Sequence, residues 1–145
     1  MGYCVDWEAM VTIPKKNLGK ALEAINELMK PENVKKNGRG GSFGGGKRTD
    51  TWYSWVDNPP NNRYETLDKA FEGWGFTYST TKDGSVVIDC IENEKLGQEE
   101  LFFGAIAPYV TSNSEVVIHG EDGAHFRWVF KNKKLVEQAG RLTFR

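Results

Sequence analysis

The segment that most restricts the fold is an alternation of side chains over residues 3–13. Its odd positions hold Tyr3, Val5, Trp7, Ala9, Val11 and Ile13, and its even positions hold Cys4, Asp6, Glu8, Met10 and Thr12. Successive side chains of a strand point to opposite faces of a sheet, so this period of two predicts a strand with one buried face and one solvated face. Pro14 ends the strand because proline has no backbone N–H.

Apolar residues next recur at helical spacing, at Leu18, Ala21, Leu22, Ile25, Leu28 and Met29. This spacing predicts an amphipathic helix that begins after an Asn17 cap and ends before Pro31. Thr66 is positioned to cap a second, short helix that Gly73 and Gly75 stop. A third helix is predicted over residues 98–107, with two acidic residues in its first turn.

Strands are predicted over 51–56, 76–80, 85–91, 115–119, 125–131, 134–138 and 141–144. The turn sequences Lys82-Asp83-Gly84 and Glu121-Asp122-Gly123 join neighbouring strands directly, and such short connections imply antiparallel pairing. We therefore expect a single α+β domain over residues 1–145, a mainly antiparallel sheet with about three helices packed on it. Hydrophobic residues are 39% of the chain and aromatic residues 12%, enough to fill the core of such a domain.

Residues 31–50 are expected to form a flexible, basic, Gly-rich loop within this domain, because glycines crowd positions 38–46. The stretch from Gly41 to Lys47 matches the GxxxxGK pattern of a phosphate-binding loop. The following position is Arg48 where that loop needs Ser or Thr, and the segment lacks the preceding strand and following helix. The sequence thus excludes a nucleotide-hydrolysing P-loop.

Positive charge is concentrated in this same segment. Residues 30–50 hold six basic and two acidic side chains, a net of +4, so the rest of a chain of net charge −1 carries −5. Backbone N–H groups of a glycine run can cradle an anion, and nearby aromatic side chains can stack on a base. The candidate ligand-binding residues are Arg39, Lys47, Arg48, Trp52, Tyr53 and Trp55. The open alternatives are a solvated connector, a protein-contact loop, and burial of both faces of the aromatic strand.

His119, His125 and Arg127 form a second group of candidates on the last hairpin. Two imidazoles near a carboxylate are the groups that general acid–base catalysis uses. Such a role needs the imidazoles to converge in a concave pocket, and exposed histidines are the plainer interpretation. Asp6 and Glu8 lie on the solvated face of the first strand, and if that strand neighbours the last hairpin, an ion pair of Arg127 with one of them is expected.

Other classes of protein have little support in the sequence. Cys4 and Cys90 are too few for a disulfide framework, and together with the two histidines they lack the spacing of a metal motif, so we expect no metal and no cofactor. The chain has no apolar run of the roughly 20 residues that a membrane helix needs and no leader pattern, and we expect a cytoplasmic protein. The oligomeric state is not indicated.

Three segments carry a resemblance to a known group of proteins: the Gly-Gly-Ser-Phe-Gly-Gly-Gly-Lys run at 40–47, Thr-Trp-Tyr-Ser-Trp-Val at 51–56, and Gly-Glu-Asp-Gly-Ala-His-Phe-Arg-Trp-Val-Phe at 120–130. Together with the early strand they resemble small uncharacterised proteins encoded in bacterial and phage genomes. The resemblance implies an accessory or inhibitor protein that masks a surface or sequesters a nucleotide signal, and it brings no known activity.

The sequence therefore predicts a non-catalytic binding protein that contacts an anionic ligand through its Gly-rich segment and the adjoining aromatic strand. The expected partner is an anionic small molecule, a nucleic acid or a host protein with an acidic surface. Two alternatives stay open. One is a small hydrolase or transferase that uses His119, His125 and a carboxylate, and the other is a protein–protein inhibitor that acts through a sheet edge.

Overall fold

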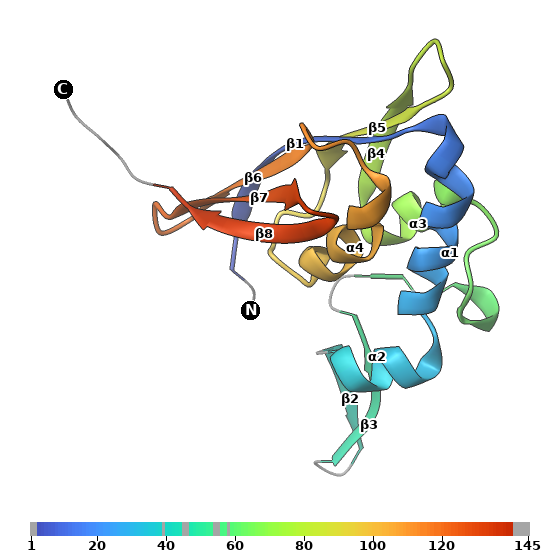
Figure 1. Ribbon diagram of the computed structural model, residues 1–145. Helices are drawn as coiled ribbons and strands as arrows, with labels where there is room; N and C mark the ends of the chain where they lie inside the picture. Colours follow the sequence, from blue (N-terminus) through green and yellow to red (C-terminus); the bar gives the residue numbers. More distant parts are fainter. Residues whose placement is uncertain (1–2, 39, 45–46, 54–55, 58, 141–145) are drawn as a thin grey trace.

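The expected fold class is confirmed by a computed structural model that describes residues 3–38, 40–44, 47–53, 56–57 and 59–140, with residues 40–44 and 47–52 described by their backbone. A six-stranded antiparallel sheet has the order β4-β5-β1-β6-β7-β8, and β2 and β3 form a separate two-stranded sheet. Figure 1 shows the larger sheet beside the helices, with β2 and β3 extending away from it.

The strands are β1 (Val5–Ile13), β2 (Gly40–Gly44), β3 (Lys47–Trp52), β4 (Phe76–Thr80), β5 (Val86–Ile91), β6 (Glu115–Gly120), β7 (His125–Lys131) and β8 (Lys134–Ala139). The α-helices are α1 (Leu18–Leu28), α2 (Pro31–Asn37), α3 (Leu67–Trp74) and α4 (Glu99–Ile106). Short 3₁₀ turns lie at Lys15–Asn17, Pro60–Asn62 and Ala107–Tyr109. None of the helices in these ranges is long and apolar enough to cross a membrane.

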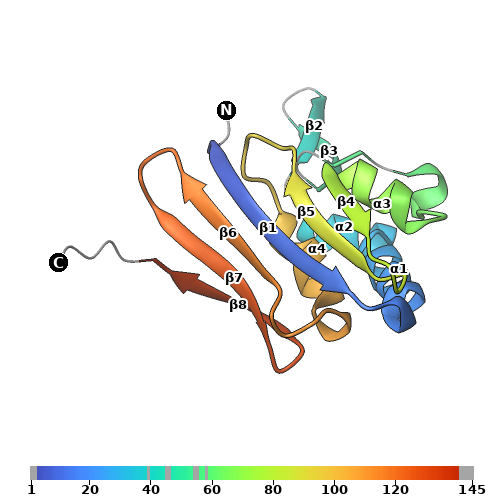
Figure 2. The same cartoon turned by 90° about the horizontal axis from the view of Figure 1, so that it is seen from above.

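The alternation at the start of the chain produces the central strand β1, which pairs with β5 on one side and β6 on the other. Val11 and Ile13 are fully buried, whereas Glu8 and Met10 on the opposite face are exposed. The helices cover the first face, and Figure 2 shows the second face of the sheet open in front of them. The polar side chains of β1, β6 and β7 therefore gather on one open face.

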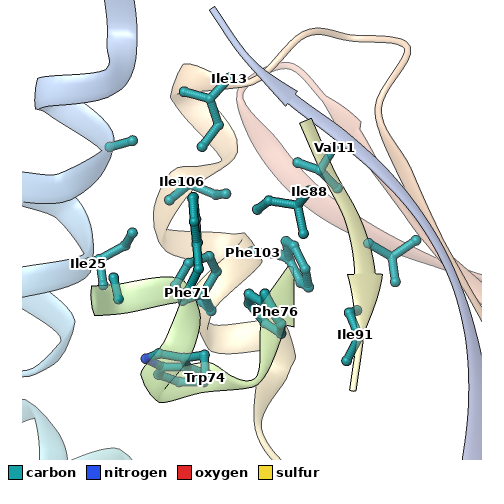
Figure 3. Packing of buried hydrophobic residues seen from close by; sticks show 14 of the residues in the cluster. Val11, Ile13, Ile25, Phe71, Trp74, Phe76, Ile88, Ile91, Phe103 and Ile106 are labelled. Atoms are coloured by element: carbon teal, nitrogen blue, oxygen red, sulfur yellow. The ribbon is translucent and has the colours of Figure 1, made fainter. Parts of the chain in front are cut away.

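The core between sheet and helices is strongly aromatic (Figure 3). Phe76 on β4 packs against Phe102 and Phe103 on α4, with ring centroids 4.8 and 5.2 Å apart. Trp74 lies 5.3 Å from Phe102 and is fully buried. Aromatic pairs contribute about 1 kcal/mol beyond the burial of their area, so α3, α4 and β4 are held as one unit.

The limits of α3 follow the predicted signals. Thr66 Oγ1 accepts a hydrogen bond from the Lys69 backbone N–H at 3.3 Å, which satisfies one free donor of the first turn. Gly75 ends the helix with φ of 81°, a left-handed conformation that residues with a Cβ rarely adopt. Asn17 precedes α1 as expected, but its side chain donates to the Tyr109 carbonyl at 3.1 Å instead of capping the helix.

Two expectations on the middle of the chain need correction. The strand expected over 51–56 begins earlier, at Lys47, and ends at Trp52. Residues 31–37, expected as part of a loop, form the additional helix α2. Pro31 is its first residue, a position where the backbone N–H has no partner within the helix, so the missing N–H of proline costs nothing. The last predicted strand, 141–144, lies outside the described residues.

Candidate functional site

The Gly-rich segment and α2 make up a structural unit that we call the basic arm (residues 31–38, 40–44 and 47–52). β2 pairs with β3 from Gly40↔Trp52 to Gly44↔Lys47, and α2 packs beside β3. The register shifts after Ser42, because Thr49 has no partner of its own. This corrects the expectation of a loop over residues 31–50: where described, the segment is a helix and a paired hairpin.

The cations of the basic arm come from two elements that lie together. Lys35 and Lys36 on α2 are exposed, while Val34 of the same helix is buried and fixes α2 to the core. Lys47 and Arg48 begin β3, opposite Gly44 and Phe43 at the far end of the hairpin. Of the other candidates, Trp52 ends β3, and Arg39 and Trp55 lie outside the described residues.

Tyr53, expected to stack on a ligand, is part of the core. Its side chain is fully buried, its ring lies 5.5 Å from that of Trp74, and its hydroxyl donates to the Leu28 carbonyl at 2.6 Å. Burial raises the pKa of this hydroxyl. Tyr53 therefore connects β3 to the end of α1 and has no surface for a base in this conformation.

His119 and His125 converge on the open face of the sheet. They stand directly opposite each other on β6 and β7, with their Nδ1 atoms 2.7 Å apart and their rings nearly perpendicular. On its other side, His119 Nε2 lies 3.3 Å from Glu8 Oε2 on β1. A carboxylate and two imidazoles thus form one hydrogen-bonded row across three strands.

Arg127 does not pair with Asp6 or Glu8, which corrects that expectation. Its guanidinium instead donates to Gln138 Oε1 at 2.8 Å and to Glu115 Oε2 at 3.4 Å. The reason is the strand order: β6 lies between β1 and β7, so the nearest carboxylate to Arg127 comes from β6.

A shallow hollow borders the histidine row, with a volume of about 290 Å³. Its lining includes His125, Arg127 and Gln138. The imidazoles therefore converge as acid–base chemistry requires, but on an exposed face, since Glu8 is 71% exposed and His119 36%. The hydrolase alternative stays a prediction.

Two features escaped the sequence analysis. One is a hollow of about 470 Å³ between α3 and the loop before it, with both acidic and basic residues in its lining, among them Asp57, Arg63 and Lys69. The other is Glu99, whose carboxylate is fully buried and whose Oε2 has no hydrogen-bond partner. The sequence analysis placed it only as one of two acids in the first turn of the third helix, and no pattern around it signals burial.

No group of three or more His, Cys, Asp or Glu side chains in the described part of the chain is arranged to hold a metal ion. Comparisons with protein-family models, with curated proteins and with solved structures gave no match.

Proposed function

We propose that the protein is a non-catalytic binding protein that holds a polyanion, a single-stranded nucleic acid, along its basic arm. The observation that carries the proposal is the net charge of +4 over residues 30–50, which include α2 and most of the β2–β3 sheet that lies outside the six-stranded sheet. A hairpin outside the main sheet that carries clustered cations is free to contact a partner with its charged residues.

The distribution of the cations favours a polyanion over a single phosphate. Lys35 and Lys36 are on α2, whereas Lys47 and Arg48 lie at the far end of the β2–β3 hairpin. Cations spread over two neighbouring elements match the repeated charges of a phosphate backbone. The residues outside 30–50 carry a net charge of −5, which repels a nucleic acid from other surfaces and directs it to the arm.

The composition of the hairpin supports the same ligand. Gly40, Gly41 and Gly44 of β2 have no Cβ, so a backbone can approach this strand closely. Trp52 at the end of β3 is an aromatic residue of the kind on which bases stack, a contact worth about 1–3 kcal/mol per base.

The test measures binding of fluorescein-labelled single-stranded DNA and RNA of mixed sequence by anisotropy, between about 50 and about 200 mM salt. Lys47→Ala/Arg48→Ala should weaken binding and reduce the salt slope by about 1.4, because each contact with a single-strand phosphate contributes about 0.7. The matched control is Lys131→Ala/Lys134→Ala, which removes the same charge from exposed positions at the end of the β7–β8 hairpin.

Two results would overturn the proposal: the wild-type protein binds none of these probes, or both double variants lose affinity and salt slope equally. In the second case the effect is one of net charge. The sheet-edge alternative makes a different prediction, since a protein partner that pairs with β8 would be retained after deletion of residues 40–45.

A further inference from the structure

The hairpin of β6 and β7 places two imidazole nitrogens close to the separation at which one metal ion can bind both. His119 and His125 are separated by five residues, which matches neither the spacing of two metal ligands on one helix face nor that of a zinc-knuckle motif. The turn nevertheless brings the two residues directly opposite each other. Their Nδ1 atoms lie 2.7 Å apart. A hydrogen bond explains this contact only if one ring donates a proton that the other accepts.

Glu8 decides which ring donates. Its Oε2 lies 3.3 Å from His119 Nε2 and accepts the proton of that nitrogen, since a carboxylate is an acceptor only. A neutral imidazole has one N–H, so His119 Nδ1 carries a free lone pair directed at His125. His125 Nδ1 is then the donor, and a single proton lies between the two nitrogens.

We propose that His119 and His125 bind one divalent transition-metal ion through their Nδ1 atoms, with the proton displaced from His125 Nδ1 carried on its Nε2, so that both rings stay neutral ligands. Carboxylate–imidazole–metal is the usual arrangement at protein metal sites, where the outer carboxylate fixes the tautomer and orientation of the ligand ring. Glu8, which accepts the Nε2 proton of His119, corresponds to this outer carboxylate. The ions that two imidazoles select are Zn²⁺, Ni²⁺ and Cu²⁺, with Cu²⁺ bound most tightly.

The geometry requires little adjustment. With metal–nitrogen bonds of about 2.0–2.1 Å and a tetrahedral angle, the two nitrogens stand about 3.3 Å apart, so the rings separate by about 0.6 Å. Both side chains are at least partly exposed to solvent.

The strand ends themselves are held in place. The backbone N–H of Cys4 donates to Glu121 Oε1 at 3.1 Å, and the Tyr3 hydroxyl donates to Asp122 Oδ1. The turn between β6 and β7 is thereby fixed to the residues that lead into β1. A rigid hairpin end keeps the two histidines in register and lowers the entropy lost when a metal binds.

The site offers two protein ligands. Since no cluster of three ligand side chains is found among the described residues, water or an external ligand completes the coordination. The bound metal is therefore exchangeable and open to a second ligand, unlike a closed structural zinc site. The Asp6 carboxylate beside His119 in the β1–β6 register adds negative charge that favours a cation.

The experiment uses the full chain without an affinity tag and titrates it separately with ZnCl₂, NiCl₂ and CuCl₂ by calorimetry. The wild type should bind one ion per chain. His119→Ala and His125→Ala should each weaken binding at least tenfold, and Glu8→Ala about tenfold, the range typical of lost outer carboxylates. Glu8→Gln should fall between Glu8→Ala and the wild type, because its amide oxygen still accepts the His119 proton.

Two thiols are the competing soft ligands, so Cys4→Ser and Cys90→Ser are the matched controls. They should bind the metal as the wild type does, and Ni²⁺ should broaden the ring proton signals of both histidines in NMR spectra. The proposal is overturned if the wild type binds none of the three ions at millimolar concentration, or if the histidine variants bind them as tightly as the wild type.

Discussion

Asn26 on α1 and the backbone of Tyr64 hold each other by a reciprocal pair of hydrogen bonds. Asn26 Nδ2 donates to the Tyr64 carbonyl at 2.9 Å, and the Tyr64 N–H donates to Asn26 Oδ1 at 2.7 Å. Both side chains are buried. One amide thus satisfies a donor and an acceptor of Tyr64, a residue that lies in no strand or helix.

Replacement of Asn26 by Ala should destabilise the protein by about 2–4 kcal/mol, because it leaves two buried backbone groups without partners. Urea denaturation followed by tryptophan fluorescence measures this loss. Asn33→Ala is the control, since the Asn33 side chain makes one exposed hydrogen bond to the Glu27 carbonyl at 2.8 Å. Equal effects of the two substitutions would contradict the role of Asn26.

Two glycines should respond to alanine in opposite directions. A Cβ on Gly75 would lie 2.7 Å from Asn93 Oδ1 in a backbone with φ of +81°, so Gly75→Ala should destabilise by about 1–3 kcal/mol. A Cβ on Gly104, in the exposed part of α4, meets nothing within 4 Å, and Gly104→Ala should stabilise by about 0.5–1 kcal/mol. Thermal melts of the two variants should shift to opposite sides of the wild type.

Elements with a strong local signal could be predicted from the sequence. The alternation of β1, the Thr66 cap of α3 and the turn at Gly123 each depend on neighbours in the chain, and all three are confirmed. The structural role of Asn26 could not be predicted from the sequence. It is a polar residue next to Ile25 of the apolar stripe, and its hydrogen-bond partner is the backbone of a residue 38 positions away. Long-range partners of single polar residues leave no periodic signal.

The candidate site shows the same limit. The convergence of His119 and His125 follows from the short turn between them, but the contact with Glu8 depends on the strand order, which the sequence left open. For Tyr53 the aromatic composition alone did not decide between a binding surface and the core. Its buried hydroxyl and the ring of Trp74 settle that question in favour of the core.

Tyr53→Phe should therefore affect stability and not ligand binding. It removes the hydrogen bond to the Leu28 carbonyl and keeps the ring packing against Trp74, so the expected loss is about 1 kcal/mol. Chemical denaturation measures the stability, and anisotropy with the labelled single strands measures the binding. A selective loss of affinity, with stability unchanged, would return Tyr53 to the ligand-binding residues.

Because of Glu99, the free energy of unfolding should decrease as the pH rises. Burial raises the pKa of its carboxyl from the ordinary value of 4.5 to about 7, although Oε1 accepts a hydrogen bond from the Gly97 N–H at 2.7 Å. Between these two values the folded state keeps a proton that the unfolded state has lost. The free energy of unfolding then decreases with pH through this window, by up to about 3 kcal/mol, and the loss is complete above the folded-state pKa.

The variant Glu99→Gln isolates this effect, because glutamine does not titrate and can still accept the Gly97 hydrogen bond. Urea denaturation at several values between about pH 5 and about pH 8 should show a smaller decrease for Glu99→Gln than for the wild type. Glu100→Gln, next to it in the first turn of α4, removes the same formal charge from a less buried position and should reduce the dependence much less, because burial is the main cause of the raised Glu99 pKa and the charge of Glu100 a smaller one. If the curves of Glu99→Gln and the wild type run parallel across this range, Glu99 is ionised in the folded protein and its carboxylate must have a partner in solution.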